Sequence, residues 1–193
     1  MNMHHIIITG ASRGIGHATA LLYASMGWNI SICSRHCDYQ MTQTQDAITA
    51  AGGQYFSFCG DMGNATDAEE FLAKAVQTFG TPEILVNNAG ISHIGLLQDM
   101  TPMQWDDIIR TNLSSVFYTS RVIIPYFLQE KHGRIINVSS VWGSVGASTE
   151  VAYSTTKGGI NAFTKALAKE LAPSGIPVNA VACGMIDLSL IHI

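Results

Sequence analysis

Short apolar runs alternate with longer segments of helical periodicity along almost the whole chain. The short runs are rich in β-branched residues and are bounded by glycine or polar residues, a pattern typical of strands. Most are apolar at nearly every position, which predicts parallel strands covered on both faces. The expected strands cover residues 3–9, 28–34, 54–58, 84–87, 134–139 and 177–181.

The segments between these runs predict helices. The expected helices cover residues 15–27, 39–51, 64–79 and 151–172, and a further long helix lies within residues 102–131. Asn64 is a candidate cap for the third helix. Because strands that alternate with helices imply right-handed crossovers, the pattern predicts an α/β fold with a doubly wound parallel sheet. We find no internal repeat or linker, so one domain is expected.

Composition fits this picture and excludes several classes of protein. The 193 residues are 47% hydrophobic and 12% charged, enough to bury a sizeable core. The net charge of −4 argues against nucleic acid or an anionic membrane as partner, and no run approaches the length of a membrane span. The four cysteines are scattered, which predicts reduced thiols in a cytoplasmic protein. No spacing of ligands supports a metal site.

Three glycines follow the first strand and open the first helix in T-G-A-S-R-G-I-G: Gly10, Gly14 and Gly16. Glycine permits the sharp turn and lets the backbone approach a pyrophosphate, which would then lie at the positive end of the helix. The segment therefore predicts a dinucleotide-binding loop. A plain turn between strand and helix is the alternative interpretation.

The residues after the second strand bear on the type of nicotinamide cofactor. A carboxylate there would repel a 2′-phosphate, but this chain has Ser34-Arg35, and Arg13 lies in the glycine segment. The two cations favour NADP(H). Two solvated surface arginines are the alternative, and Asp38, three residues after Arg35, argues against NADP(H).

Tyr153 and Lys157 are four positions apart and would share a helix face, and Ser140 follows the fifth strand. Ligands bind at the carboxyl edge of such sheets, so Ser140 can donate to a carbonyl oxygen there. A nearby ammonium is expected to lower the pKa of the Tyr153 phenol and to make it a proton donor. Together these residues predict reduction of a ketone by a nicotinamide. A chance surface pair is the alternative interpretation of Y-x-x-x-K alone.

These motifs together resemble the short-chain dehydrogenase/reductase family, which the chain matches in order over almost its whole length. The resemblance rests on G-x-x-x-G-x-G, the N-N-A-G segment at residues 87–90, Ser140, Y-x-x-x-K and V-N-A-V-A-C-G at residues 178–184. It implies a Rossmann-type sheet with strand order 3-2-1-4-5-6. It also implies a homo-oligomer of the full-length protein that acts on a small-molecule or carrier-bound carbonyl substrate.

The resemblance further assigns roles to single residues. Asn112 would hold a water that links Lys157 to solvent, and Ser140 is selected over Ser139 because it precedes Val141-Trp142-Gly143. The implied catalytic residues are Asn112, Ser140, Tyr153 and Lys157. The implied NADP(H)-binding residues are Gly10, Ser12, Arg13, Gly14, Ile15, Gly16, Arg35, Asp61, Met62, Asn88, Ala89, Gly90, Tyr153, Lys157, Gly184 and Ile186.

The substrate stays open between two alternatives. The chain looks most like the 3-oxoacyl-[acyl-carrier-protein] reductase branch of the family. Residues 142–187 also resemble reductases of a 5-oxopentanoyl-type lysine modification on elongation factor P, and Cys183 departs from the usual proline as in that group. Trp142 and Glu150 are candidates for the mouth of the pocket. A catalytically silent NADP(H)-binding scaffold is the alternative from another functional class.

The resemblance also bears on the last residues. Members of the family usually continue with a substrate lid and a seventh strand, and we expect this chain to lack both. Residues 188–193 are the translation of CTGTCTCTTATACACATC, a nucleotide sequence that resembles the transposase mosaic-end adapter of sequencing libraries. We therefore expect residues 1–187 to form the domain and residues 188–193 to be a non-native tail. A truncated chain of this kind is expected to have little activity. A natural short isoform is the alternative.

Overall fold

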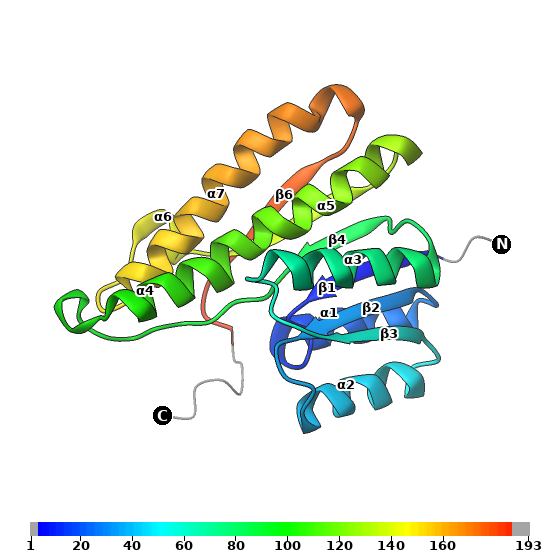
Figure 1. Cartoon of the computed structure of the whole chain (residues 1–193), viewed down its shortest axis with the longest axis horizontal. Coiled ribbons are helices and arrows are strands. Elements are labelled where there is room, and N and C mark those ends of the chain that lie inside the picture. The colour runs from blue at the N-terminus through cyan, green and yellow to red at the C-terminus, as the bar shows by residue number, and fades with distance from the viewer. Residues whose placement is uncertain (1–3, 187–193) are drawn as a thin grey trace.

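The computed structural model describes residues 4–186, so the expected tail at residues 188–193 lies outside the described residues. One sheet of six parallel strands runs through the molecule in the order β3-β2-β1-β4-β5-β6, which confirms the predicted fold and strand order (Figure 1). The strands are β1 His5–Thr9, β2 Asn29–Ser34, β3 Gln54–Cys59, β4 Ile84–Asn87, β5 Arg134–Ser140 and β6 Val178–Cys183.

Helices connect successive strands and cover the sheet. The α-helices are α1 Gly14–Ser25, α2 Tyr39–Ala50, α3 Ala65–Phe79, α4 Pro102–Ile109, α5 Ser115–Glu130, α6 Trp142–Val145 and α7 Val151–Leu171. A π-helical segment, η2 Arg110–Ser114, joins α4 to α5, and the 3-10 segments are η1 Leu97–Asp99 and η3 Ala172–Ser174. No helix in the described part of the chain combines the length and hydropathy needed to cross a bilayer.

Alternate residues of the central strands pack into two separate hydrophobic cores, one on each face of the sheet. On β1, Ile7 packs into a core with residues of α3, α5 and α7, which include Phe71 and Phe127. Ile6 and Ile8 face the opposite side and pack with residues of α1 and α2. Because successive side chains of a strand point to opposite faces, both faces of β1 are buried. The apolar runs of the sequence therefore mark a sheet covered on both sides.

The two edge strands depart from the expectation of full coverage. In β3 no residue is fully buried, and in β6 Val178 is buried whereas Asn179 to Ala182 are exposed. The reason is topological: an edge strand lacks one lateral neighbour, and β6 packs against α7 on one face. The apolar character of residues 177–181 thus predicted a strand correctly but its double burial wrongly.

The long helix expected within residues 102–131 is interrupted by the π-helical turn η2. Its beginning is well defined, because Thr101 and Gln104 form a reciprocal capping box and Pro102 is the first helical residue. A π-turn inserts an extra residue into the helix, and such turns are frequent at functional sites. Here the wider turn contains Arg110, Thr111 and Asn112, all at the carboxyl edge of the sheet.

Most other boundaries moved by one or two residues. Asn64 caps α3 as expected, with its Oδ1 accepting from the amides of Thr66 and Asp67. β5 extends to Ser140, and β6 covers residues 178–183 rather than 177–181, because its ladder with β5 continues to the pair Ser140–Cys183. The short helix α6 was not predicted. It matters for the site because it follows Ser140 directly.

Candidate active site

The turn between β1 and α1 has no room for side chains at two of its glycines. Gly10 has a φ of +65°, and a Cβ there would lie 2.7 Å from the Cα of Ala89. A Cβ on Gly16 would lie 2.6 Å from the carbonyl oxygen of Gly10 and 2.6 Å from Nδ2 of Asn88. The turn is therefore packed backbone to backbone against the segment that follows β4.

Hydrogen bonds fix these two segments to each other. Oγ1 of Thr9 accepts from the amides of Asn88 and Ala89, each at 3.0 Å. Nδ2 of Asn88 donates to the carbonyl oxygens of Thr9 at 3.0 Å and Gly10 at 2.8 Å. The side chain of Asn88 is thus used to join β4 to the glycine turn. Ala89 is half-buried and Gly90 is exposed beside it.

The N-terminus of α1 is open toward this surface. Arg13 is the N-cap residue, and no side chain caps the helix amides. Arg13 is exposed, and Ser12, Gly14 and Ile15 are half-buried next to it. Uncapped amides and the helix dipole together attract anions. The predicted residues of the glycine segment therefore share one positively polarised turn.

Replacing Gly16 by alanine is expected to destabilise the protein by about 1–3 kcal/mol, because the new methyl group would overlap backbone atoms. Helix propensity alone would predict the opposite sign, a gain of about 1 kcal/mol. Urea denaturation of the two proteins measures the difference in the free energy of unfolding. A more stable Gly16→Ala variant would contradict the close packing of this turn.

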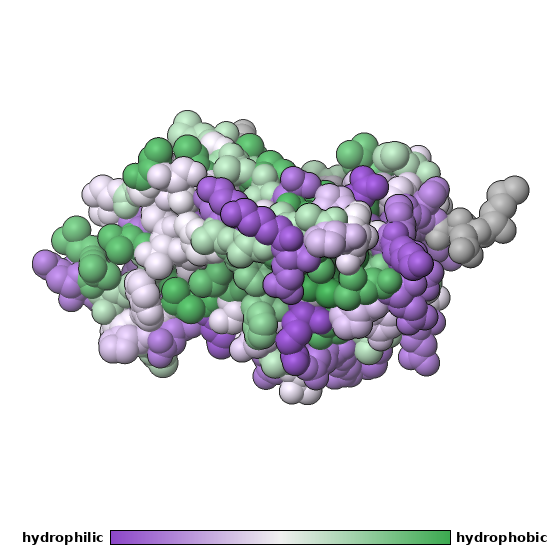
Figure 2. All heavy atoms as spheres, turned by 90° about the horizontal axis from the view of Figure 1, so that it is seen from above, coloured by the Kyte–Doolittle hydropathy of each residue, from purple (hydrophilic) through white to green (hydrophobic). Residues whose placement is uncertain are grey.

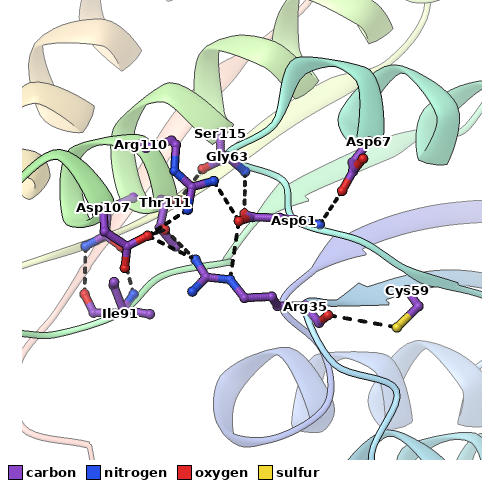
Figure 3. Close-up of polar contacts among 11 residues, drawn as sticks. Arg35, Cys59, Asp61, Gly63, Asp67, Ile91, Asp107, Arg110, Thr111 and Ser115 are labelled. Carbon is purple, nitrogen blue, oxygen red and sulfur yellow. Dashed lines mark hydrogen bonds and ion pairs between the residues drawn. The ribbon is translucent and has the colours of Figure 1, made fainter. Parts of the chain in front are cut away.

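At the end of β2, the side chain of Arg35 reaches across the sheet edge toward the π-helical turn η2 (Figure 3). Its Nη2 donates to Oγ1 of Thr111 at 2.6 Å, and its Nε lies 3.5 Å from Oδ2 of Asp61. Arg110 donates to the same Asp61 oxygen at 2.6 Å and to Oδ1 of Asp107 at 2.7 Å. Two arginines thus share two carboxylates, Asp61 after β3 and Asp107 in α4.

The charges around Asp61 determine its protonation. Burial by itself raises the pKa of the Asp61 carboxyl, but hydrogen bonds from Arg110 and the Gly63 amide, with the charge of Arg35, hold that pKa below its usual value. The hydrogen bond to Asp61 raises the pKa of the Arg110 guanidinium. Asp61 is therefore ionised and strongly partnered.

Two neighbouring residues have structural tasks. Asp38, which argued against NADP(H) in the sequence, caps α2, with Oδ1 accepting from the amides of Gln40 and Met41 at 3.1 and 3.2 Å. Its carboxylate therefore serves the first turn of a helix. The side chain of Met62 is buried in the core, so only its main chain is open to a ligand.

Ser140, Tyr153 and Lys157 come together where β5 ends and α7 begins. The Ser140 hydroxyl lies close enough to the Tyr153 phenol to lower its pKa as a hydrogen-bonding neighbour. Nζ of Lys157 lies 5.5 Å from the centroid of the Tyr153 ring and donates to the carbonyl oxygen of Val138 at 2.8 Å. Ser139 points elsewhere, toward Asn161 and the Lys157 carbonyl. The structure therefore brings together the three side chains that the motif spacing singled out.

The electrostatics of this group differ from the sequence expectation. Burial raises the pKa of the Tyr153 phenol, and the hydrogen bond with Ser140 only partly offsets it. Burial also lowers the pKa of the Lys157 ammonium to about 8. The predicted lowering of the tyrosine pKa by Lys157 is wrong for this arrangement, because burial of the phenol outweighs the effects that lower its pKa. The phenol is therefore protonated at neutral pH.

Asn112 is fully buried in η2 and braces the segment after β4. Its Nδ2 donates to the carbonyl oxygen of Ile91 at 2.8 Å and to Oγ1 of Thr156 at 3.2 Å, and its Oδ1 accepts from the Ile91 amide at 2.7 Å. The side chain thus connects the sheet edge to α7, one residue before Lys157.

One side of the site is apolar. The Gly95 amide donates to the Thr149 carbonyl at 2.8 Å, which joins the segment after β4 to the segment before α7. Large exposed apolar side chains lie on these segments and the adjoining helices: Ile94, Leu96, Leu97, Met103 and Val145. Figure 2 shows a group of apolar residues at this end of the molecule, among polar ones. Trp142 and Glu150 are half-buried nearby.

The remaining predicted residues, Gly184 and Ile186, follow β6 and are exposed. The sequence analysis missed Asp107, Arg110, Thr111 and Thr156, all of which contact predicted site residues. Helical spacing could have placed Arg110 and Thr111 near Asp107, but only the strand order brings Arg110 to Asp61. No group of three or more His, Cys, Asp or Glu side chains in residues 4–186 is arranged to hold a metal.

Comparisons with known proteins agree with this geometry. The family model for short chain dehydrogenases matches residues 4–192. The 3-oxoacyl-[acyl-carrier-protein] reductase FabG of Staphylococcus aureus is 39% identical over 180 residues, 93% of this chain and 73% of that protein. D-beta-hydroxybutyrate dehydrogenase of Cupriavidus necator is 37% identical over 192 residues, which cover this chain and 74% of the relative. A crystal structure from Sinorhizobium meliloti 1021, described as a short-chain alcohol dehydrogenase, superposes with a TM-score of 0.93, 29% identity and coverage of 99% and 75%.

Proposed function

Because the chain belongs to the short chain dehydrogenase family, we propose that it is an NADPH-dependent reductase that converts a 3-oxoacyl thioester to the 3-hydroxy product. Members of this family use NAD(P)(H) and act on small carbonyl compounds. The observation that carries the proposal is the meeting of Ser140, Tyr153 and Lys157 beside the glycine turn. A nucleotide-binding scaffold without chemistry would not need these three groups close together.

The residues of the glycine turn fit a dinucleotide. Gly10 and Gly16 have no side chain, and a Cβ at either position would overlap backbone atoms. The backbone of the turn is therefore left accessible to a pyrophosphate. The uncapped amides of α1 would hold its charge, with Ser12, Gly14 and Ile15 beside it. The adenosine would lie near Arg35, Asp61 and the main chain of Met62, and its ribose near residues 88–90. The nicotinamide end would lie near Tyr153, Lys157, Gly184 and Ile186, and would supply the hydride.

Arg13 and Arg35 support the choice of NADPH over NADH. Arg35 follows β2 and Arg13 precedes α1 in the glycine turn, and Asp38, the carboxylate that could repel a 2′-phosphate, is held in the cap of α2. Arg35 presents a planar fork of donors suited to phosphate.

The protonated phenol suits Tyr153 to give a proton to the carbonyl oxygen of the substrate. Ser140 would donate a hydrogen bond to the same oxygen and orient it. Lys157, whose pKa of about 8 allows it to gain and lose a proton near neutral pH, would return a proton toward the phenol. Asn112 would hold the start of α7 in position through its hydrogen bond to Thr156, and would hold the proposed water that links Lys157 to solvent.

The relatives and the apolar side of the site support this substrate class. One relative is named for a 3-oxoacyl group and another for beta-hydroxybutyrate, and both names refer to oxygen on the same carbon of an acyl chain. Exposed apolar residues such as Ile94 and Val145 beside the site would contact such a chain. Reduction of a 5-oxopentanoyl group on elongation factor P is the narrower alternative suggested by residues 142–187.

Oxidation of NADPH in the presence of acetoacetyl thioester, free acetoacetate, a simple ketone and modified elongation factor P tests the proposal. We expect turnover that is fastest with the thioester and requires Tyr153. Preference for the elongation factor would redirect the substrate assignment. NADPH binding without turnover of any of these compounds would favour the silent scaffold.

Arg35→Asp is expected to reverse the cofactor preference, because it removes a phosphate partner and adds a repelling carboxylate. A lost charge-assisted hydrogen bond of about 1.5–3 kcal/mol corresponds to roughly ten- to hundredfold weaker NADPH binding. Fluorescence titration with NADPH and NADH measures the two dissociation constants. An unchanged ratio would mean that the 2′-phosphate is bound by other residues.

A further inference from the structure

Arg110 and Arg35 compete for the same two oxygen atoms. Arg110 lies 2.6 Å from Oδ2 of Asp61 and 2.7 Å from Oδ1 of Asp107. Arg35 lies 3.5 Å and 3.7 Å from the same two atoms. Figure 3 shows both guanidinium groups converging on these carboxylates. The shorter contacts belong to Arg110, so Arg35 is the more loosely held of the two cations.

The difference in distance has a consequence for any anion that approaches Arg35. If Arg35 turns away toward a phosphate, Asp61 and Asp107 both retain their shorter ion pair with Arg110. Without Arg110, both carboxylates would have Arg35 as their nearest cation, and that guanidinium would be drawn between them. The phosphate would then have to break two unshared ion pairs and would face two carboxylates with one cation.

The π-helical turn explains why Arg110 can do this. Asp107 and Arg110 are three residues apart and pair along the helix, while the wide turn at residues 110–114 directs the same guanidinium to Asp61 after β3. Thr111 in the same turn accepts a hydrogen bond from Arg35 at 2.6 Å. This neutral acceptor holds Arg35 at the sheet edge without adding charge.

Resting on the proposed NADPH preference, we propose that Arg110 is a positioning residue for cofactor specificity. It keeps Asp61 and Asp107 partnered so that Arg35 is released to bind the 2′-phosphate of the adenosine. Arg110 itself contacts no part of the cofactor in this proposal. It sets the ratio of affinities for phosphorylated and unphosphorylated adenosine through the two carboxylates.

Calorimetric binding of adenosine 2′,5′-bisphosphate and of AMP tests this without turnover. In Arg110→Gln the affinity for the bisphosphate is expected to fall about tenfold while the affinity for AMP changes little. Arg110→Lys should give an intermediate loss, because one ammonium cannot bridge both carboxylates. In the double variant Arg110→Gln/Asp107→Asn one competing carboxylate is removed, and most of the lost affinity should return.

Arg121→Gln is the matched control. Arg121 lies on α5, about three turns after Arg110, and forms an exposed ion pair with Glu69 of α3. The substitution therefore removes the same charge from a pair outside the site. It should leave both affinities unchanged. If Arg110 served only to stabilise the contact between η2 and the segment after β3, Arg110→Gln would lower the melting temperature and would weaken the binding of AMP and of the bisphosphate equally. That result would overturn the proposal.

Asp107→Asn alone keeps the test decisive if Arg110→Gln does not fold. This variant should bind the bisphosphate equally or up to about threefold more tightly, and weaker binding would overturn the proposal. The NADPH preference and the role of Arg110 can be contradicted separately. Equal affinity of the unaltered protein for AMP and bisphosphate would overturn both the NADPH preference and the role of Arg110. A preference that depends on Arg35 but not on Arg110 would overturn the role of Arg110 alone.

Discussion

Replacing Tyr153 with phenylalanine is expected to lower the rate of ketone reduction by at least about 100-fold, and by up to about 10,000-fold, while NADPH affinity stays nearly constant. The change removes one oxygen atom and leaves the ring, which is packed at the start of α7. The lost atom is the proposed proton donor to the substrate oxygen and the partner of Ser140. Loss of rate without loss of binding is the signature of a group that acts in the transition state.

Single-turnover reduction of acetoacetyl thioester and fluorescence titration with NADPH measure the two quantities separately. Tyr55→Phe is the matched control, because Tyr55 is an exposed residue near the start of β3, at the opposite end of the strand from the site. It should leave both quantities unchanged. A Tyr153→Phe protein that kept more than about a tenth of the rate would remove Tyr153 from the role of general acid.

The sequence was sufficient for the order of the elements and for the neighbourhood of the site. Apolar runs fix which segments are strands, and the right-handed crossover rule then restricts how they can be ordered. Once the order is known, the ends of β1, β4 and β5 must meet at one edge. Spacing alone places Tyr153 and Lys157 on one helix face. These features depend on local periodicity, which a single sequence displays directly.

The contacts that tune the site could not be predicted in this way. The pair Arg110–Asp61 joins residues 49 positions apart, and its length depends on a π-turn that has no clear signature in the residues 110–114. The raised pKa of Tyr153 depends on burial of the phenol and on the charges of neighbouring elements. Both are properties of packing between elements, to which motif spacing is insensitive.

Lys157 gives the second large expected effect, and it acts on rate and stability in opposite directions. Lys157→Met should lower the rate of reduction by at least about 100-fold, because it removes the cation behind the phenol. NADPH affinity should also fall, since the nicotinamide ribose is assigned to the same ammonium. Stability at pH 7 should rise, because a charged group that is 4% exposed is replaced by an apolar one of similar length.

The sign of the stability change follows from the pKa of Lys157. Burial lowers that pKa from 10.5 to about 8, so the unfolded state binds the proton more tightly than the folded state. Below about pH 8 both states are protonated and the cost to the folded state is complete, about 3 kcal/mol. As the pH rises from 8 to 10.5, the folded state releases its proton first and the unaltered protein gains stability.

The advantage of the Lys157→Met protein should therefore be largest at pH 7 and should shrink toward pH 10.5. The unpaired carbonyl of Val138 offsets about 1 kcal/mol, which leaves a net gain of about 1–2 kcal/mol at pH 7. Urea titrations of both proteins from pH 7 to 10 measure the difference in the free energy of unfolding. Lys165→Met, at an exposed position on the same helix, is the control and should show no such trend. A Lys157→Met protein that is less stable at pH 7, with a difference independent of pH, would mean that this lysine stabilises the fold and would leave its place in the chemistry without electrostatic support.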